Sequence, residues 1–193
     1  DALYLRPYGL VTFIGNHDTK RILSEQGMTP QKLKAAFGLL MTLRGIPEIY
    51  TGDEVAMTGG DDPENRHDFP GGWPGDKQNA FQKSSRTPEQ EEMHHYVKSL
   101  VALRREYPAL RDGRQWTIGT GTNYYAYLRE DGSERLLMVF SKKGGSVEIP
   151  LADTPLASAR SLEPLMGAPA ATVVAGTIKT TTQDFSVAIY RVR

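Results

Sequence analysis

The sequence predicts an α/β region followed by an all-β region, and three observations lead to this expectation. Two short β-rich segments each run into polar residues and alternate with amphipathic helical patterns as far as about Glu106. Thr-Pro pairs that suit helix starts occur twice in this stretch. From about Tyr107 the pattern changes to short strand-like runs separated by turn signals. We therefore expect an α/β region at residues 1–106 and a small antiparallel β-sandwich at residues 107–193.

The first β/α unit is expected to begin with a buried strand at Leu10–Ile14, a short and bounded β-rich run. The polar residues that follow it would lie at its carboxyl end. A helix should start at Pro30, behind Thr29 as its N-cap. Its apolar residues follow helical spacing as far as Gly45, which we expect to be the C-cap.

The second unit is expected to begin with a short strand at Glu48–Tyr50, which again runs into acidic residues. A polar loop rich in Gly and Pro fills residues 58–85, and loops of this length tend to be functional. Thr87 and Gln90 form a capping box that starts the next helix. The order strand, helix, strand, loop, helix predicts two β/α units of a parallel sheet or barrel.

The second region is expected to contain at least six short strands. Turn signals such as Asp131-Gly132 and Gly144-Gly145 separate several of them. Strands of this length and spacing are typical of a small antiparallel sandwich. The expected strands are residues 115–119, 124–129, 135–141, 146–149, 160–164 and 185–192.

The composition excludes several classes of protein. Lys plus Arg and Asp plus Glu both number 23, so no net charge draws the chain to nucleic acid or to an anionic membrane. Cysteine is absent, which excludes disulfides, thiolate catalysis and Cys-based zinc sites. No run of 18 apolar residues is present, so we expect no membrane-spanning segment. The chain begins at Asp1 rather than Met, from which we expect a piece of a longer protein.

The clearest candidate site is Asn16-His17-Asp18, directly after the first expected strand. The carboxyl ends of barrel strands are where (β/α)8 enzymes carry their catalytic groups. A structural alternative is that Asp18 caps the turn while His17 bonds to the backbone. Spacing alone favours the structural alternative.

Two further motifs add to this one. Residues 45–54 read GIPEIYTGDE, and residues 62–66 read DPENR. In this order and at this separation from the NHD motif, they resemble the α-amylase family, glycoside hydrolase family 13. The DPxNR motif resembles its neopullulanase and cyclomaltodextrinase branch. The resemblance extends from Val11 to about Gly113 and implies the last two β/α units of a (β/α)8 barrel, from strand 7 to helix 8, before a C-terminal β-sandwich.

The resemblance also implies roles for individual residues. Asp18 would be the carboxylate that stabilises the transition state by holding sugar hydroxyls, and His17 would donate to neighbouring hydroxyls. Asn16 would help to set the turn. Asp62 and Arg66 would contact the next sugars on the non-reducing side, with a local surface salt bridge as the alternative. The implied substrates are α-glucan oligosaccharides with α-1,4 or α-1,6 linkages, in maltodextrins, cyclodextrins or pullulan.

Trp73 lies in a segment, DFPGGWPGD at residues 68–76, that resembles neopullulanases of periplasmic starch-utilisation systems. Its ring would suit stacking on a glucose ring, and a merely packed or exposed tryptophan is the alternative. This resemblance makes the periplasm the expected compartment of the parent protein, with the cytoplasm as the alternative.

The retaining mechanism needs a carboxylate nucleophile and a second carboxylic acid. In the family these follow the fourth and fifth barrel strands, and neither motif occurs here. We therefore expect the 193-residue chain to be inactive by itself. Its open strand edge would associate with the second region or with another copy, which makes a homo-oligomer one option.

Other classes fit less well. The run of acids at residues 61–65 lacks the Gly and Glu positions of an EF-hand, and adjacent His94 and His95 point in different directions, so we expect no metal site and no cofactor. A non-catalytic carbohydrate-binding or structural module remains the main alternative to an enzyme fragment. Its sugar-binding aromatics would be Trp116, Tyr124, Tyr125 and Tyr127, of which alternation places Tyr125 and Tyr127 on one face.

Overall fold

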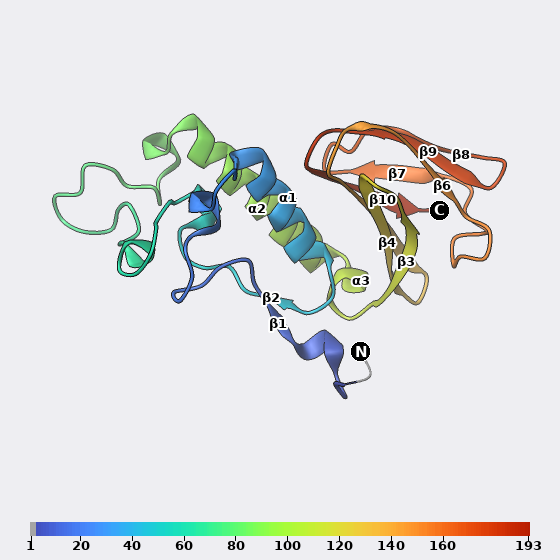
Figure 1. The fold of residues 1–193 in the computed structure, drawn as a ribbon, viewed down its shortest axis with the longest axis horizontal. Coiled ribbons are helices and arrows are strands. Elements are labelled where there is room, and N and C mark those ends of the chain that lie inside the picture. The colour runs from blue at the N-terminus through green and yellow to red at the C-terminus, as the bar shows by residue number, and fades with distance from the viewer. Residues whose placement is uncertain (1–2) are drawn as a thin grey trace.

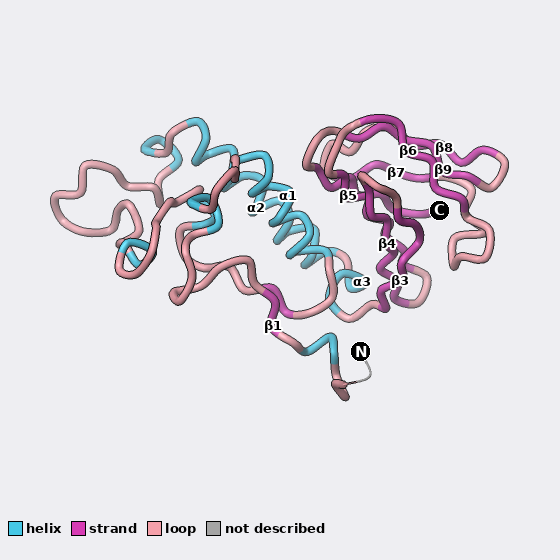
Figure 2. Tube along the Cα trace, in the orientation of Figure 1, coloured by secondary structure: helices cyan, strands magenta, loops and turns pink. Residues whose placement is uncertain are grey.

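The computed structural model describes residues 3–193, so Asp1, on which the expectation of an excised piece depends, lies outside the described residues. Figure 1 shows two long helices lying beside two β-sheets, with an extended loop region on the side of the helices away from the sheets. The loops dominate between residues 48 and 87, and Figure 2 shows only short helical turns there. No helix of residues 3–193 is both long and apolar enough to cross a membrane.

The first two strands are parallel neighbours, as expected, but they are much shorter. Strand β1 is Val11–Thr12 and β2 is Ile46–Pro47, with Val11 opposite Ile46. The predicted extents, residues 10–14 and 48–50, were therefore wrong, although the backbone N–H of Glu48 still donates to the Thr12 carbonyl oxygen at 2.8 Å. About half of the Val11 and Ile46 side-chain surface stays exposed, and two strands without a covered face form little regular sheet.

Helix α1, Pro30–Thr42, starts as predicted. The Thr29 hydroxyl accepts a hydrogen bond from the backbone N–H of Lys32. The helix ends three residues before Gly45, with Leu43 as its C-cap, so the expected cap was wrong. Gly45 instead has φ +111°, and a Cβ there would lie 2.9 Å from the Leu10 carbonyl oxygen. This glycine is needed where the chain passes close to β1.

Helix α2, Pro88–Glu106, starts with the predicted capping box. The Thr87 hydroxyl accepts from the Gln90 backbone N–H, and the Gln90 side chain accepts from the Thr87 N–H. A single-turn helix, α3, follows at Pro108–Arg111. Between α1 and α2 lie 3₁₀ turns at residues 53–55, 64–66 and 83–85. Two more such turns, at residues 7–9 and 22–24, precede α1.

The second region forms two antiparallel sheets. The five-stranded sheet has the order β3-β4-β5-β10-β7, and the three-stranded sheet has the order β6-β9-β8. The strands are β3 Arg114–Thr120, β4 Tyr124–Asp131, β5 Glu134–Ser141, β6 Gly145–Pro150, β7 Leu162–Leu165, β8 Ala171–Val174, β9 Thr177–Thr182 and β10 Ser186–Val192. All six predicted strands are present to within two residues at each end. Strands β8 and β9 were not predicted.

Two apolar clusters cover both faces of the five-stranded sheet. One lies between the two sheets and includes Leu128, Leu137, Val139, Ile149, Ile178 and Tyr190. The other lies between the sheet and the helices and includes Leu33, Phe37, Leu100, Tyr127, Met138 and Ile189. Burial of this apolar surface is the main force that holds the helices on the sheet. The helical and sheet regions therefore share a core.

Two buried arginines bond to the end of α1, one from helix α2 and one from the sheet region. Arg129, on β4, is fully buried and donates to the carbonyl oxygens of Thr42 at 2.8 Å and Gly113 at 3.1 Å. Arg104, on α2, donates to the Met41 carbonyl at 2.8 Å. Burial lowers the pKa of Arg129 to about 10. The last carbonyls of a helix lack partners within the helix, and these guanidinium groups satisfy them.

Candidate active site

The segment after β1 forms a tight polar turn that places Asp18 at the surface. The Asn16 side-chain oxygen accepts from the Asp18 backbone N–H at 2.9 Å, and the Asn16 N–H donates to the Thr19 hydroxyl at 3.1 Å. Side-chain bonds of this kind replace a regular ladder at the end of a strand. The turn ends the extended segment and projects the side chains of His17 and Asp18 outward.

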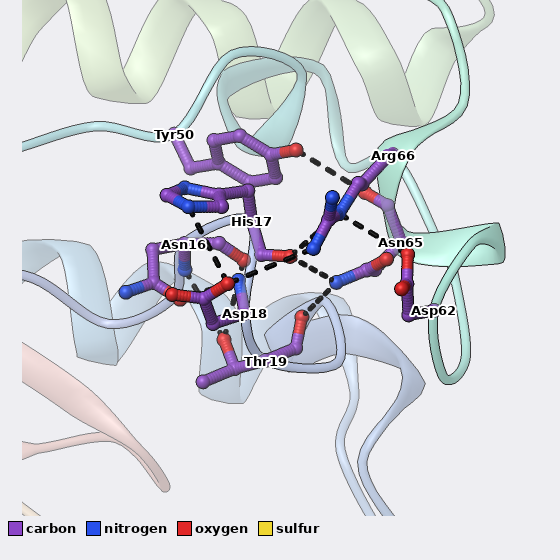
Figure 3. Close-up of polar contacts among 8 residues, drawn as sticks. All are labelled: Asn16, His17, Asp18, Thr19, Tyr50, Asp62, Asn65 and Arg66. Carbon is purple, nitrogen blue, oxygen red and sulfur yellow. Dashed lines mark hydrogen bonds and ion pairs between the residues drawn. The ribbon is translucent and has the colours of Figure 1, made fainter.

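Charged and polar side chains converge around the Asp18 carboxylate (Figure 3). His17 Nε2 lies 3.4 Å and Arg66 Nη2 lies 3.6 Å from Asp18 Oδ1. The side chains of His17 and Asp18 are 63% and 66% exposed, so solvent and ligand can reach them. One carboxylate therefore stands beside an imidazole and a guanidinium on an open surface.

Arg66 connects this turn to the acidic loop. Its Nε lies 3.2 Å from Asp62 Oδ1 and donates to the His17 carbonyl oxygen at 3.0 Å. The salt bridge that we considered for Asp62 and Arg66 is thus present, and both partners stay about half or more exposed. An exposed ion pair of this kind adds little stability. Because both side chains are exposed, Asp62 and Arg66 remain available to a ligand.

Asn65 is a site residue that the sequence analysis missed. Its side chain is buried, and its amide nitrogen donates to the carbonyl oxygens of His17 at 2.8 Å and Thr19 at 2.9 Å. These carbonyls belong to the residues on either side of Asp18. Figure 3 shows Asn65 and Arg66 approaching the turn from the same loop. The sequence signal for Asn65 is its fixed place in the DPxNR motif, directly before Arg66.

A buried ion pair underlies this loop. Arg21 Nη1 lies 2.9 Å from Asp53 Oδ1, and both side chains are only 2% exposed. The Arg21 guanidinium also lies 4.5 Å from the centre of the Tyr50 ring, whose hydroxyl donates to the Asn65 carbonyl oxygen at 3.5 Å. Burial raises the pKa of Asp53 to about 6, although the hydrogen bond from Arg21 opposes this shift. Asp53, in the GDE segment, thus holds Arg21 against Tyr50, which in turn contacts the backbone of Asn65.

Trp73 is not part of this group. Its side chain is 68% exposed, and its backbone N–H donates to Asp76 Oδ2 at 2.9 Å. Trp73 lines a small surface hollow with Asp68, Phe69 and neighbouring residues of the same loop. Within the part of the chain that the structure describes, no hydrogen bond or ion pair joins the Trp73 side chain to His17, Asp18 or Arg66. Four predicted residues, His17, Asp18, Asp62 and Arg66, do come together, with Asn16 beneath them.

The site presents several charged and polar side chains to solvent. No group of three or more His, Asp or Glu side chains in residues 3–193 is arranged to hold a metal. The carboxylates, imidazole and guanidinium present many hydrogen-bond donors and acceptors within a few ångströms. Such a surface suits the hydroxyl groups of a polyhydroxylated ligand.

Known proteins with the same fold and motifs define the class. Residues 6–135 match the family model for the α-amylase catalytic domain. Since this match covers most of the chain, the protein belongs to the α-amylase family, glycoside hydrolase family 13.

Similar proteins include a cyclomaltodextrinase, a maltogenic α-amylase and a neopullulanase, as well as cyclomaltodextrin glucanotransferases. The chain is 36% identical over 140 residues to a cyclomaltodextrinase of Geobacillus thermopakistaniensis, which covers 72% of this chain and 22% of that protein. It is 34% identical over 142 residues to a maltogenic α-amylase of Bacillus acidopullulyticus, with 72% and 22% covered. It is 30% identical over 138 residues to neopullulanase 2 of Thermoactinomyces vulgaris, with 70% and 21% covered. The chain thus spans about a fifth of the length of these relatives.

Solved structures share the fold over nearly the whole chain. An α-amylase from Geobacillus thermoleovorans, solved in complex with acarbose, has a TM-score of 0.79 at 24% identity and covers 98% of this chain. An Anoxybacillus α-amylase has a TM-score of 0.80 at 25% identity and covers 99%. The matched parts are 40% and 39% of those two chains.

Proposed function

We propose that this chain is the C-terminal portion of a retaining α-glucan hydrolase that acts on α-1,4 or α-1,6 linkages of maltodextrins, cyclodextrins or pullulan. One observation carries the proposal. Two segments far apart in the sequence bring His17, Asp18, Asp62 and Arg66 onto one exposed surface, after a pair of parallel strands. The names of the relatives, cyclomaltodextrinase, maltogenic α-amylase and neopullulanase, supply the substrate class.

In this proposal, Asp18 stabilises the transition state. The transition state of glycoside hydrolysis resembles an oxocarbenium ion, and hydrogen bonds to sugar hydroxyls strengthen as it forms. An exposed carboxylate accepts such bonds, and the neighbouring His17 donates to adjacent hydroxyls. Asn16 sets the turn that presents both groups.

Asp62 and Arg66 contact the sugars next along the chain on the non-reducing side. Their exposure and their contact with the turn place a carboxylate and a guanidinium beside the central pair. Trp73 would contribute a stacking surface further out, since its ring is exposed. The ligand of this whole surface is an α-glucan oligosaccharide.

The architecture of the parent enzyme is part of the proposal. Residues 1–106 would supply the last two β/α units of a (β/α)8 barrel, with β1 as strand 7 and β2 as strand 8. Residues 107–193 would be the C-terminal β-sandwich. The exposed apolar side chains of Leu10, Val11, Phe13 and Ile46 support this assignment, because neighbouring barrel elements would cover them.

The nucleophile and the general acid would come from the rest of that barrel. A retaining enzyme holds these two carboxyl groups about 5–5.5 Å apart. In the parent, Asp18 is the third carboxylate and does not replace either of them. The chain by itself would then lack hydrolytic activity.

We place the parent in the periplasm, because residues 68–76 resemble neopullulanases of periplasmic starch-utilisation systems.

The alternative of a non-catalytic module has little support from the sheet aromatics. Tyr127 is fully buried and contacts the Thr42 hydroxyl, and Tyr125 stacks on it with ring centres 5.1 Å apart. Tyr124 packs against the cluster between the two sheets. These contacts close Tyr127 to a ligand and leave Tyr124 and Tyr125 half-buried, whereas Trp116 stays 39% exposed.

Two proteins test the proposal: the 193-residue chain and the longer protein that contains it. Each is incubated with maltoheptaose, pullulan and a cyclodextrin, and released glucose and maltose are measured. The longer protein should release sugar, and the short chain should match a heat-denatured control. Absence of hydrolysis by the longer protein would refute the function, whereas turnover by the short chain would show that the catalytic residues are misassigned.

A further inference from the structure

A groove separate from the candidate active site lies where the helices meet the turns of both sheets. It has a volume of about 430 Å³ and is lined by α1, α2, the segment after β7, and the turn between β9 and β10. Small-molecule sites fall at about 300–1,000 Å³ and occur preferentially at junctions of this kind. None of the residues that line it belongs to the group around Asp18.

The hydroxyl of Tyr96 in this groove has no protein partner. Among the described residues, no hydrogen bond reaches it, and the only ring contact of Tyr96 is with the Lys34 ammonium at 6.0 Å. Burial raises the pKa of Tyr96 to about 12, so the hydroxyl stays protonated and can donate. The Tyr96 oxygen is not fully buried, so water or a ligand can satisfy it.

Two groove residues have left-handed backbones without being glycine. Phe185, in the turn between β9 and β10, has φ +44°, and Met166 has φ +50°. An aromatic residue in this region is strained, and such strain is concentrated at ligand-binding positions. Gln31 holds the turn by donating to the Phe185 carbonyl oxygen at 3.1 Å. The Lys32 ammonium lies 4.9 Å from the Phe185 ring centre.

The charges of the groove select the class of ligand. Its two charged side chains, Lys34 and Glu92, form an ion pair with each other. These two charges offset each other, and the Lys32 ammonium beside the Phe185 ring is bonded to the Gly27 carbonyl oxygen. The other polar lining groups are amides and hydroxyls, such as those of Gln31, Gln183 and Thr181, beside the two aromatic rings. Neutral donors and acceptors next to flat apolar surfaces suit a sugar ring.

We propose that this groove binds a neutral saccharide independently of the candidate active site. The Tyr96 hydroxyl and the amide of Gln183 would bond to sugar hydroxyls, and the Phe185 ring would pack on the apolar face of the sugar. The site does not depend on the proposed hydrolysis, because none of its residues takes part in that chemistry.

The test uses the 193-residue chain and maltotriose as the probe, with binding followed by calorimetry or by amide chemical shifts. Phe185→Gly removes the ring while relieving the left-handed strain, so the fold should be retained. It should weaken binding by at least about fivefold. Tyr96→Phe removes only the hydroxyl and should weaken binding by roughly two- to tenfold.

Two control variants make the result specific. Ala175 also has a left-handed backbone, at φ +47°, but lies outside the groove, so Ala175→Gly makes a comparable backbone change without affecting binding. Asp18→Asn reports on binding at the candidate active site, so a loss confined to this variant belongs to that site and not to the groove. Thermal unfolding checks that each variant is folded. The proposal is overturned if maltotriose shows no saturable binding in the millimolar range. It is also overturned if Asp18→Asn abolishes binding while Phe185→Gly preserves it.

Discussion

The side-chain amide nitrogen of Asn65 lies 2.8 Å from the main-chain carbonyl oxygen of His17. The same nitrogen donates to the Thr19 carbonyl at 2.9 Å, so one buried amide fixes the backbone on both sides of Asp18. Small displacements of a catalytic group reduce rates steeply. Asn65 is therefore a positioning residue in the proposed enzyme rather than a catalytic one.

Asn65→Asp should lower kcat of the full-length enzyme by about tenfold or more, with a smaller change in KM. The substitution keeps the shape of the side chain but turns a carboxylate oxygen toward two carbonyl oxygens, which repel it. Asn123→Asp, at an exposed position in the sheet region, makes the same chemical change and should have no effect. Steady-state kinetics on maltoheptaose, with thermal unfolding as a check, measure this. Unchanged kcat in a folded Asn65→Asp variant would contradict the positioning role.

Asp18→Asn should reduce turnover far more than stability. The side chain is 66% exposed, and substitutions at such positions usually change the free energy of unfolding by less than about 0.5 kcal/mol. The loss of hydrogen bonds that strengthen in the transition state should lower kcat by on the order of 10²-fold or more. Hydrolysis rates and denaturant unfolding of the full-length enzyme separate the two effects. A stable variant with near-normal activity would remove Asp18 from the mechanism.

Asp62→Ala and Arg66→Ala should both raise KM for maltoheptaose more than for maltotriose, because the sugars that they contact are remote from the cleaved bond. The structure distinguishes the two variants further. Arg66 also contacts Asp18 and the His17 carbonyl, so Arg66→Ala should in addition lower kcat. Kinetics with both oligosaccharides test this. Equal effects on the short and the long substrate would favour a purely local salt bridge.

Arg129→Met should destabilise the 193-residue chain by about 2–4 kcal/mol. Methionine fills a similar volume but leaves the Thr42 and Gly113 carbonyl oxygens buried without their donor. Arg160 is exposed, so Arg160→Met loses the same charge at little cost and serves as the control. Urea unfolding followed by circular dichroism compares the two. Equal midpoints would mean that the Arg129 hydrogen bonds contribute nothing net.

Local signals predicted most of the secondary structure. Thr29 and Thr87 cap helices through bonds to backbone groups three residues away, and these bonds depend on sequence alone. The extents of β1 and β2 were wrong because strand length depends on neighbours that the local pattern does not contain. Strand β9 was missed because its inward positions include Thr180 and Thr182, whose polarity hides the alternation.

The candidate site, like the secondary structure, could be predicted only in part from the sequence. The NHD, GDE and DPxNR motifs identified the segments, and four of the predicted side chains meet as their order suggested. Asn65 is a fixed position of the DPxNR motif, but its role could not be predicted because it depends on two carbonyl groups nearly fifty residues away. The role of Arg21 could not be predicted for a similar reason, since its partner Asp53 follows a different strand. Trp73 remains a prediction.

The two sheets are not an independent unit that the sheets of another protein could replace. Thr42, the last residue of α1, is held by the Tyr127 hydroxyl and by the Arg129 guanidinium, and both belong to β4. A chimera joined at residue 107 would discard the groups that complete the end of this helix. Grafts between relatives should therefore keep β4 with the helices. Recombination during evolution would meet the same constraint, with viable crossover points displaced into the turns beyond this strand.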